Sequence, residues 1–407
     1  MLTQRLLADK LAAVRRSQGT ASPSRPLAAD RADGLARWLG AELRVADVGR
    51  VILIERSIPL PVDVAAALAT LPAACYFDTE TTGLSTGAGT VVFLAALGRL
   101  DGQRLVVHQY LLPDYPDELA LLRHVAAELA VAERLVTYNG RAFDLPLVVA
   151  RLTVNGLFSA MAEIPQRHDD LLPVARRLWR RSLGGARLAD VERGVLGVER
   201  TSDCPSWEVP GRWFGYLRGG SPELLVAVLD HNLQDIASLA LLEGELLRLR
   251  AGGWRNAAAL DHRGMAIELL RDGRGADALE VLEHALDGTV DPAEAAGLRR
   301  LSSRLLLAGG EPERAEALWR DGTRRASIEA ATAWVEVARI RERHRGDLRG
   351  ALEATQAASR VLDLAFALGR GGSIEAIART RLIVDRRLRR LRRWVAAAER
   401  RRARVAA

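Results

Sequence analysis

The stretch CYFDTETTGLSTGAGTVVFLAALG, residues 75–98, decides the fold prediction. Two carboxylates, Asp78 and Glu80, stand one residue apart at the end of a short apolar run, and a glycine-rich loop leads to a second apolar run from Thr90. Apolar runs bounded by turn residues predict buried strands. The carboxylates then have two interpretations: the polar exit of a strand into solvent, or half of a metal site.

Length and composition narrow the class of protein. A chain of 407 residues is long enough for two or three domains with separate cores. No window approaches 18 consecutive apolar residues, so we expect no membrane partner, and the first residues do not resemble a secretory signal. The two cysteines, Cys75 and Cys204, form no disulfide framework, which favours a cytoplasmic, reducing location.

Residues 73–250 alternate between strand-like and helix-like segments. The predicted strands cover 73–79, 90–100, 104–112 and 134–139, and the main predicted helices cover 116–130, 144–156 and 221–249. This order predicts an α/β domain with a mixed sheet flanked by helices. Residues 1–72 are interpreted as an N-terminal extension that packs on this domain. It contains a helix at 3–17, a second helix near 31–42 and one strand at 50–60.

Residues 255–365 are predicted to be entirely helical and repetitive. Ala-Leu pairs at 278/279, 317/318 and 351/352 lie 39 and 34 residues apart, and 34 residues is the tetratricopeptide period. Such helix pairs bury their apolar faces by stacking on their neighbours and offer a groove to a protein partner. A plain helical bundle is the alternative.

The positive charge lies at the C-terminus. The net charge of the chain is +7, whereas residues 379–407 alone carry twelve arginines against Asp385 and Glu399. We interpret 373–407 as a basic helical tail. Contact with nucleic-acid phosphates, a solvated helix and a membrane-surface role are its three interpretations.

Two further carboxylates extend the pattern that begins at Asp78 and Glu80. Asp144 begins a helix after a strand and a glycine-containing turn, and Asp235 lies in a helix between the apolar Leu233 and Ile236. A carboxylate on a buried helix face requires a partner, because burying a lone charge is costly. Four such groups without basic neighbours in sequence indicate cations, and hard oxygen ligands suit Mg²⁺ or Mn²⁺.

These residues also carry a resemblance to a known family. FDTETTGL, YNGRAFDLP and HNLQD resemble the three motifs of the DEDD superfamily of 3′–5′ exonucleases, which has a ribonuclease H-like fold. GLSTGAGTVVFL, RHDDLLPVARRLW and GGARLADVERGVLG are similar to the YprB-like group of bacterial ribonuclease H-like proteins, as are helical repeats after the domain. The resemblance covers 73–250 by its motifs and 255–365 by architecture alone.

The resemblance implies a set of functional residues. Asp78, Glu80, Asp144 and Asp235 correspond to the ligands of two Mg²⁺ or Mn²⁺ ions and are thereby catalytic. The amides of Thr81, Thr82 and Gly83, with the small loop 85–89, would let a nucleotide approach closely. Asn139 and Asp170 are candidates for substrate binding, and His168 and Asp170 for a structural or substrate-orienting role.

His231 departs from the family pattern. The family carries either a histidine five residues or a tyrosine four residues before the last aspartate, whereas His231 lies four residues before Asp235. Four residues are about one helical turn, so both side chains share a face. His231 is therefore a candidate general base, with a cap or a phosphate contact as the alternative role.

A cluster of aromatic residues follows in SWEVPGRWFGYLRGG, residues 206–220. These side chains either stack on unpaired bases or pack the loop onto the sheet.

The predicted function is a metal-dependent exonuclease that hydrolyses phosphodiester bonds at a 3′ end of DNA or RNA by a two-ion mechanism. A non-catalytic nucleic-acid-binding module, or a protein-interaction scaffold that uses the same domain and the helical repeats, is the alternative.

Overall fold

The computed structural model describes residues 31–83, 89–200, 204–257, 259–289, 291–324, 326–370 and 373–406. The predicted helix at 3–17 and most of the loop at 85–89 lie outside the described residues. The chain divides into two compact units, one ending at Asp261 and the other beginning at His262. Each unit has its own clusters of buried apolar residues.

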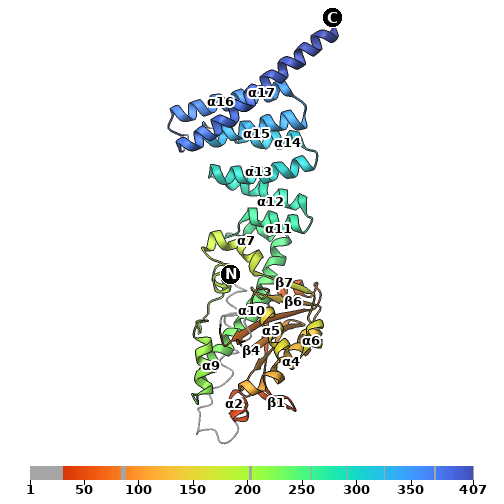
Figure 1. Ribbon diagram of the computed structural model, residues 1–407, viewed down its shortest axis with the longest axis vertical. Helices are drawn as coiled ribbons and strands as arrows, with labels where there is room; N and C mark the ends of the chain where they lie inside the picture. The colour runs from red at the N-terminus through yellow and green to blue at the C-terminus, as the bar shows by residue number, and fades with distance from the viewer. Residues whose placement is uncertain are drawn as a thin grey trace. The chain divides into compact units, whose positions relative to one another are not determined.

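The first unit is built on one mixed sheet of seven strands in the order β1-β2-β5-β4-β3-β6-β7 (Figure 1). The five strands β1, β2, β5, β4 and β3 pair in antiparallel fashion with their neighbours in the sheet. β6 pairs in parallel with β3, and β7 pairs in parallel with β6. The strands are β1 (Glu42–Ala46), β2 (Gly49–Pro59), β3 (Ala74–Thr81), β4 (Val92–Asp101), β5 (Arg104–Leu111), β6 (Arg134–Thr137) and β7 (Arg167–Asp170). The predicted mixed α/β architecture, which the ribonuclease H-like fold shares, is confirmed.

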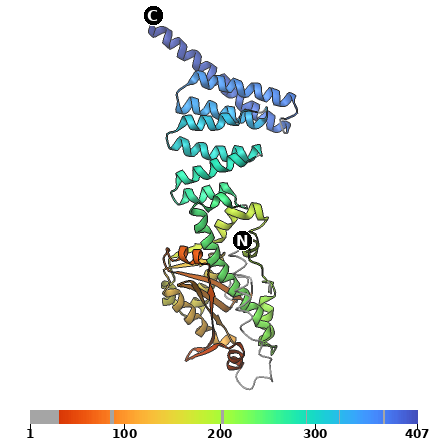
Figure 2. The same cartoon turned by 180° about the vertical axis from the view of Figure 1, so that it is seen from behind.

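Helices cover both faces of this sheet. They are α2 (Arg31–Leu39), α3 (Val62–Leu68), α4 (Glu118–Ala130), α5 (Asp144–Val154), α6 (Phe158–Ala162), α7 (Leu172–Leu183), α8 (Leu188–Val191), α9 (Val209–Leu217) and α10 (Glu223–Arg250). The long α10 crosses the face seen in Figure 2. Successive side chains of β3 point to opposite faces of the sheet. The Tyr76 hydroxyl donates to Glu243 of α10 on one face, whereas the Thr79 hydroxyl donates to Asp144 of α5 on the other.

Helix α10 packs closely because the sheet makes room for it. A Cβ atom on Gly98 of β4 would lie 2.5 Å from Ile236 of α10, so glycine permits the approach. Within the described residues α10 is the one helix long and apolar enough to cross a membrane, but 72% of its most apolar window is buried inside the protein. It is therefore a core helix of this unit.

The predicted segments differ from the structure in several places, and α3 was not among the predicted helices. β1 and β7 were not predicted, and β1 and β2 extend the sheet into the part interpreted as an N-terminal extension. The 221–249 helix begins at Glu223, with the Ser221 hydroxyl accepting the Glu223 N–H at 3.3 Å, so its predicted start differs by one or two residues.

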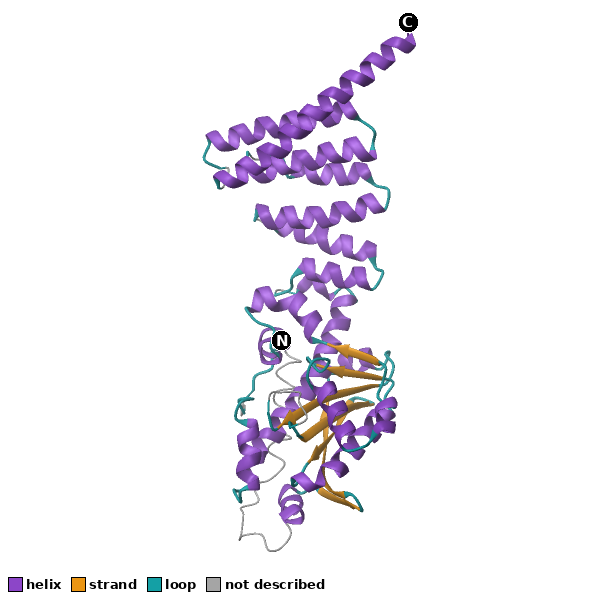
Figure 3. Cartoon of the chain, in the orientation of Figure 1, coloured by secondary structure: helices purple, strands orange, loops and turns teal. Residues whose placement is uncertain are grey.

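The second unit is helical in its described residues (Figure 3). Its helices are α11 (His262–Arg271), α12 (Gly275–Gly288), α13 (Pro292–Ala308), α14 (Pro312–Asp321), α15 (Ile328–His344), α16 (Leu348–Ala367) and α17 (Ile374–Ala406). Gly273, Gly310 and Gly346 take positive φ angles of 75°, 77° and 65° in the turns α11–α12, α13–α14 and α15–α16. This shared turn, which favours glycine, indicates three helical hairpins. The all-helical prediction is confirmed, and the tetratricopeptide assignment stays a prediction.

Candidate active site

The four predicted carboxylates come from β3, α5 and α10. Asp78 and Glu80 lie on β3, Asp144 is the first residue of α5, and Asp235 lies in α10. Hydrogen bonds fix two of them. Asp78 Oδ2 accepts from Asn232 Nδ2 at 2.8 Å, and Asp144 Oδ1 accepts from the Thr79 N–H at 3.1 Å and the Thr79 hydroxyl at 2.6 Å.

The carboxylates also act on one another electrostatically. Burial, followed by the charges of Asp235, Asp144 and Glu80, raises the pKa of Asp78 well above its usual value. Burial and the charges of Asp235 and Asp144 raise the pKa of Glu80 in the same way, against a lowering effect of Arg200. Burial, with a smaller effect of Asp235, raises the pKa of Asp144 to about 6. The site therefore holds more negative charge than the side chains around it compensate.

His231 lies between two of these carboxylates and Arg200. Its Nε2 is 3.9 Å from Glu80 Oε1 and 3.7 Å from Asp235 Oδ2, and its Nδ1 is 3.0 Å from Arg200 NH1. A guanidinium only donates hydrogen bonds, so Nδ1 accepts and the proton of a neutral His231 resides on Nε2. His231 and Asp235 lie close together, one helical turn apart, as predicted. The hydrogen bond from Arg200 determines which tautomer a neutral His231 adopts.

Arg200 was not singled out from the sequence. It contacts Asp235 and forms a two-pronged pair with Glu192, with Nε–Oε2 at 2.6 Å and NH2–Oε1 at 2.9 Å. Glu192 is only 1% exposed and begins a π-helical turn, Glu192–Leu196, a distortion that is frequent at functional sites. Burial lowers the pKa of Arg200, but the charges of Asp235 and Glu192 outweigh it and the pKa is raised. Arg200 is a permanent cation of the site.

Asn232 was also missed as a site residue. It is fully buried and accepts from Gln109 Nε2 at 3.0 Å through its side-chain oxygen, which turns its amide group toward Asp78. The available signal was a polar residue on the buried face of an apolar helix, because such a residue requires partners.

A cavity of about 160 Å³ opens beside the carboxylates. Its lining residues come from β3, α5, the start of α9 and the segments next to these elements: Thr79, Glu80, Thr81, Gly83, Phe143, Asp144, Leu147, Ser206, Val209 and Pro210. Phe143 is 48% exposed at this cavity, and Trp207, next to the lining residue Ser206, is 77% exposed. The cavity joins two of the carboxylates to exposed aromatic surface.

The predicted substrate-binding residues are engaged in other contacts. Thr82 donates its N–H to Val91 O at 3.0 Å and accepts the Val91 N–H through its hydroxyl at 2.9 Å, so its amide serves the β3–β4 connection. Thr81 donates its hydroxyl to Gly83 O at 2.7 Å, and both residues line the 160 Å³ cavity.

Asp170 accepts backbone N–H groups. The donors are Asn139 at 2.7 Å, Leu172 at 3.1 Å and Arg141 at 3.3 Å, and Asn139 has a φ angle of 70°. Asp170 thus holds the turn after β6 in place. His168 hydrogen-bonds Thr137 Oγ1 at 2.8 Å. The contacts of Asp170 and His168 are structural, and a substrate role for Asp170 or Asn139 stays a prediction.

The aromatic cluster divides between core and surface. Trp213 is buried, stacks on Phe93 with ring centroids 5.0 Å apart and donates its indole N–H to Leu112 O. Tyr216 is also buried, whereas Trp207 is exposed. Packing therefore accounts for Trp213 and Tyr216. Phe214 is partly buried and packs against the same core, whereas Trp207 is available to stack on a ligand.

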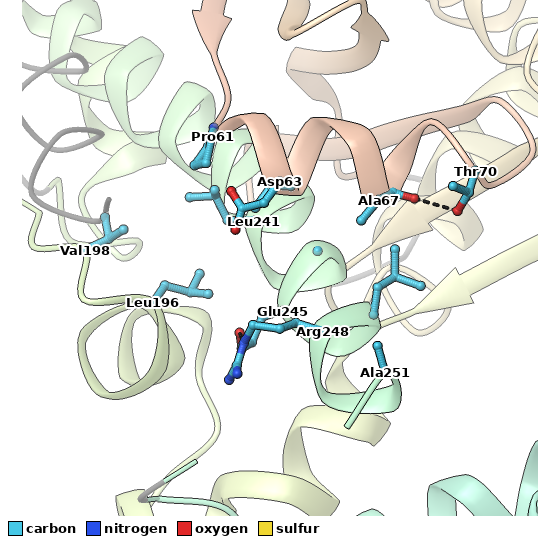
Figure 4. A pocket seen from close by; sticks show the side chains of 13 residues that line it. Pro61, Asp63, Ala67, Thr70, Leu196, Val198, Leu241, Glu245, Arg248 and Ala251 are labelled. Atoms are coloured by element: carbon cyan, nitrogen blue, oxygen red, sulfur yellow. Dashed lines mark hydrogen bonds and ion pairs between the residues drawn. The ribbon is translucent and has the colours of Figure 1, made fainter. Parts of the chain in front are cut away.

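A second cavity, of about 540 Å³, lies between α3 and the C-terminal half of α10 (Figure 4). Its lining is mainly apolar, and two of its charged residues, Glu245 and Arg248, pair with each other at 2.6 Å. It involves residues 241–248 of α10 and Ala251 just after it, whereas the carboxylate site uses residues 231–235 of α10, so the two are separate features.

The donor set fits hard divalent cations. Four carboxylates supply oxygen ligands. Burial first, and then the charges of neighbouring carboxylates, raise the pKa values of Asp78, Glu80 and Asp144, and a bound Mg²⁺ or Mn²⁺ would favour their charged forms. In the described part of the chain, no three His, Cys, Asp or Glu side chains already enclose a metal position. Arg200, which forms an ion pair with Asp235, neutralises part of the negative charge of the four carboxylates.

Comparison with known proteins agrees with this description. A family model described as the RNase_H superfamily matches residues 75–247. The uncharacterized protein YprB of Bacillus subtilis (strain 168) is 40% identical over 168 residues, which cover 41% of this chain and 40% of that protein. The chain thus aligns with about two fifths of this relative's length.

Among solved structures, the family B DNA polymerase from Pyrobaculum calidifontis is similar at 16% identity and a TM-score of 0.36, over 49% of this chain and 29% of the polymerase. The match to the family model and the mixed sheet together show that residues 75–247 have an RNase H-like fold.

Proposed function

We propose that this protein is a metal-dependent nuclease that removes nucleotides from the 3′ end of DNA or RNA. The observation that carries the proposal is the convergence of Asp78, Glu80, Asp144 and Asp235, whose negative charges act on one another, at one partly buried site within an RNase H-like domain. A binding module has no physical need to gather four carboxylates, because each one repels the phosphates of its ligand.

The four carboxylates would hold two Mg²⁺ or Mn²⁺ ions. When bound, such ions supply charge neutralisation at the scissile phosphate and lower the pKa of the attacking water. The chain's own contribution is positioning. Asn232 orients Asp78 and Thr79 orients Asp144, each through hydrogen bonds of 2.6–3.1 Å, so both carboxylates are fixed in direction.

His231 is the proposed proton acceptor for the attacking water. In the arrangement described above its proton is on Nε2, and Nδ1 is engaged with Arg200. His231 can accept a proton at Nε2 only after that proton moves to Nδ1, which requires Arg200 to release it. The proposal therefore includes a shift of Arg200 when cations and substrate bind.

One observation favours the non-catalytic alternative, in which the domain only binds nucleic acid. Arg200 already pairs with Asp235, so a protein cation occupies one proposed ligand. The alternative predicts that this pair persists when substrate binds.

The test is degradation of 5′-labelled single-stranded DNA and RNA with Mg²⁺, with Mn²⁺ and with EDTA. We expect stepwise shortening from the 3′ end that requires a cation, and a loss of at least about a hundredfold for Asp78→Asn, since disturbing even the partners of metal ligands costs 10- to 100-fold. His231→Ala should lower the rate about 10²- to 10⁴-fold while strand binding is kept. Asp63→Asn, an exposed carboxylate of α3, is the matched control.

The outcomes separate the alternatives. Cation-independent binding without shortening of any strand, in folded protein, would establish the binding module instead. An unchanged rate in His231→Ala would remove the histidine from the mechanism and leave the carboxylate site standing.

A further inference from the structure

Helix α17, the last helix of the second unit, has two different sides. One side is packed against α15 and α16 through the buried residues Val384, Leu388 and Leu391. At 3.6 residues per turn, these three positions lie on one stripe of the helix. The packing fixes which side of α17 faces the surface of the unit.

A row of arginines runs along the opposite side. Successive members are spaced by seven, three, four, seven and four residues, which keeps them on one face of a helix, and all are exposed: Arg379, Arg386, Arg389, Arg393, Arg400 and Arg404. We call this row the arginine stripe. It extends about 38 Å along the axis at 1.5 Å per residue.

The arginine stripe is not neutralised by the protein. Elsewhere on α17, Arg381 pairs with Asp363, and Arg387 and Arg390 pair with Glu342. No residue of the stripe has an ion pair with any described carboxylate. Like charges three and four residues apart destabilise a helix, so the row is unfavourable without a polyanion to bind.

The form of the stripe favours one class of polyanion. Arginine binds phosphate oxygens in a forked, two-bond geometry, and about 38 Å corresponds to one turn of a nucleic-acid duplex. A helix that lies on a membrane must present a continuous apolar face to the lipid. The buried stripe of α17 packs against α15 and α16, and its exposed apolar side chains, such as Leu382, Ile383 and Trp394, are scattered between arginines. A nucleic-acid backbone therefore fits better than a lipid surface.

We propose that the arginine stripe of α17 binds the phosphate backbone of a nucleic acid with little regard to sequence. This surface is separate from the RNase H-like domain and goes beyond the proposed cleavage. It would supply a second, electrostatic contact to a nucleic acid, whether or not the first unit hydrolyses it.

The experiment measures binding of the full chain to fluorescently labelled 24-nucleotide DNA, RNA and duplex DNA by anisotropy in EDTA, so that cleavage plays no part. The test variant replaces three adjacent stripe residues: Arg386→Gln, Arg389→Gln, Arg393→Gln. The control removes the same charge from exposed arginines elsewhere in the second unit: Arg300→Gln, Arg304→Gln, Arg343→Gln. A third variant carries lysine at the three stripe positions and retains the charge.

We expect the stripe variant to bind about tenfold or more weakly than the control at 100 mM salt. Its slope of log affinity against log salt should fall by about two on single strands, at about 0.7 per lost phosphate contact. The lysine variant should retain most of the binding. Circular dichroism checks that all variants keep their helices.

Two results would overturn the proposal. One is equal loss in the stripe and control variants, which would mean that net charge alone matters. The other is unchanged nucleic-acid binding together with lost sedimentation on phosphatidylserine vesicles, which would assign the stripe to a membrane. Because EDTA removes any metal-dependent cleavage, either result is independent of the nuclease proposal.

Discussion

At the residue scale, Arg200 and Glu192 are the support of the carboxylate site. Glu192 is buried and Arg200 nearly so, and they meet through two hydrogen bonds, with Ser238 also donating to Glu192. Removing one member of a buried pair leaves an uncompensated charge, whereas removing both is far less damaging. The pair therefore gives a sharp test of the geometry around Asp235.

We expect Arg200→Gln to lower the free energy of unfolding by about 3–5 kcal/mol, because Glu192 then loses its partner. The double variant Arg200→Gln, Glu192→Gln should recover more than half of that loss. Urea unfolding in EDTA measures both. Additive losses in the double variant would show that the two side chains are not coupled and that the pair is misplaced.

The sequence predicted the carboxylates better than their surroundings. Asp78 and Glu80 are two residues apart on a strand, and His231 and Asp235 are about one helical turn apart. Each pair therefore shares a face of its element, and local periodicity is enough to predict this. Arg200 and Asp235 are 35 residues apart and meet only through the tertiary fold. No local pattern marks such a contact, and Arg200 lies three residues beyond the motif GGARLADVERGVLG, which contains only its partner Glu192.

At the scale of elements, β5 and α4 are joined by a titratable cluster on the face of the sheet away from α10. His108 Nδ1 lies 2.7 Å from Glu128 Oε1, and its Nε2 lies 3.4 Å from Glu55. The hydrogen bond to Glu128 raises the pKa of His108, and the same bond lowers the pKa of Glu128. Tyr110 and Arg99 also contact Glu128.

The raised pKa of His108 and the lowered pKa of Glu128 determine how the stability of this cluster depends on pH. The stabilisation from His108 is complete below its unfolded pKa of 6.5 and is lost as pH rises through the raised folded value. The stabilisation from Glu128 is complete above 4.5 and is lost as pH falls through the lowered folded value. Both are present together between pH 4.5 and 6.5.

We therefore expect His108→Gln to reduce the free energy of unfolding most at pH 5.5, by on the order of 1 kcal/mol, and much less at pH 9. Urea unfolding at the two pH values measures the difference. The pKa of His124 is lowered by burial, but His124 is present in both the wild type and His108→Gln, so its contribution to the pH dependence cancels in the comparison. An equal effect at both pH values would contradict the charged pair.

Element prediction failed where strand character is not local. β7 is only RHDD, four residues without an apolar alternation, and it exists because it pairs in parallel with β6. β1 is a mostly exposed edge strand, ELRVA, which pairs only with β2. The strands that were predicted, β2 to β6, are mostly apolar runs, since burial leaves a direct signal in composition.

At the scale of the whole molecule, the sheet unit and the helical unit have separate apolar cores. The proposed cations bind only the first. Binding to the folded state stabilises by about 2.7 kcal/mol at a cation concentration one hundred times the dissociation constant.

We expect two unfolding transitions in calorimetry, of which Mn²⁺ raises only one, by roughly 5–10 °C. Asp78→Asn should abolish that shift. A shift of both transitions, or of neither, would contradict the assignment of the cation site to the first unit.

In the proposed mechanism, the four carboxylates together hold divalent cations. The most direct measurement is Mn²⁺ binding by electron paramagnetic resonance to the wild-type chain, Asp78→Asn, Asp235→Asn and the exposed control Asp63→Asn. We expect two ions per chain for the wild type and Asp63→Asn, and at least tenfold weaker binding for the two site variants. Binding that Asp78→Asn and Asp235→Asn leave unchanged, or no binding at millimolar Mn²⁺, would contradict the proposed mechanism.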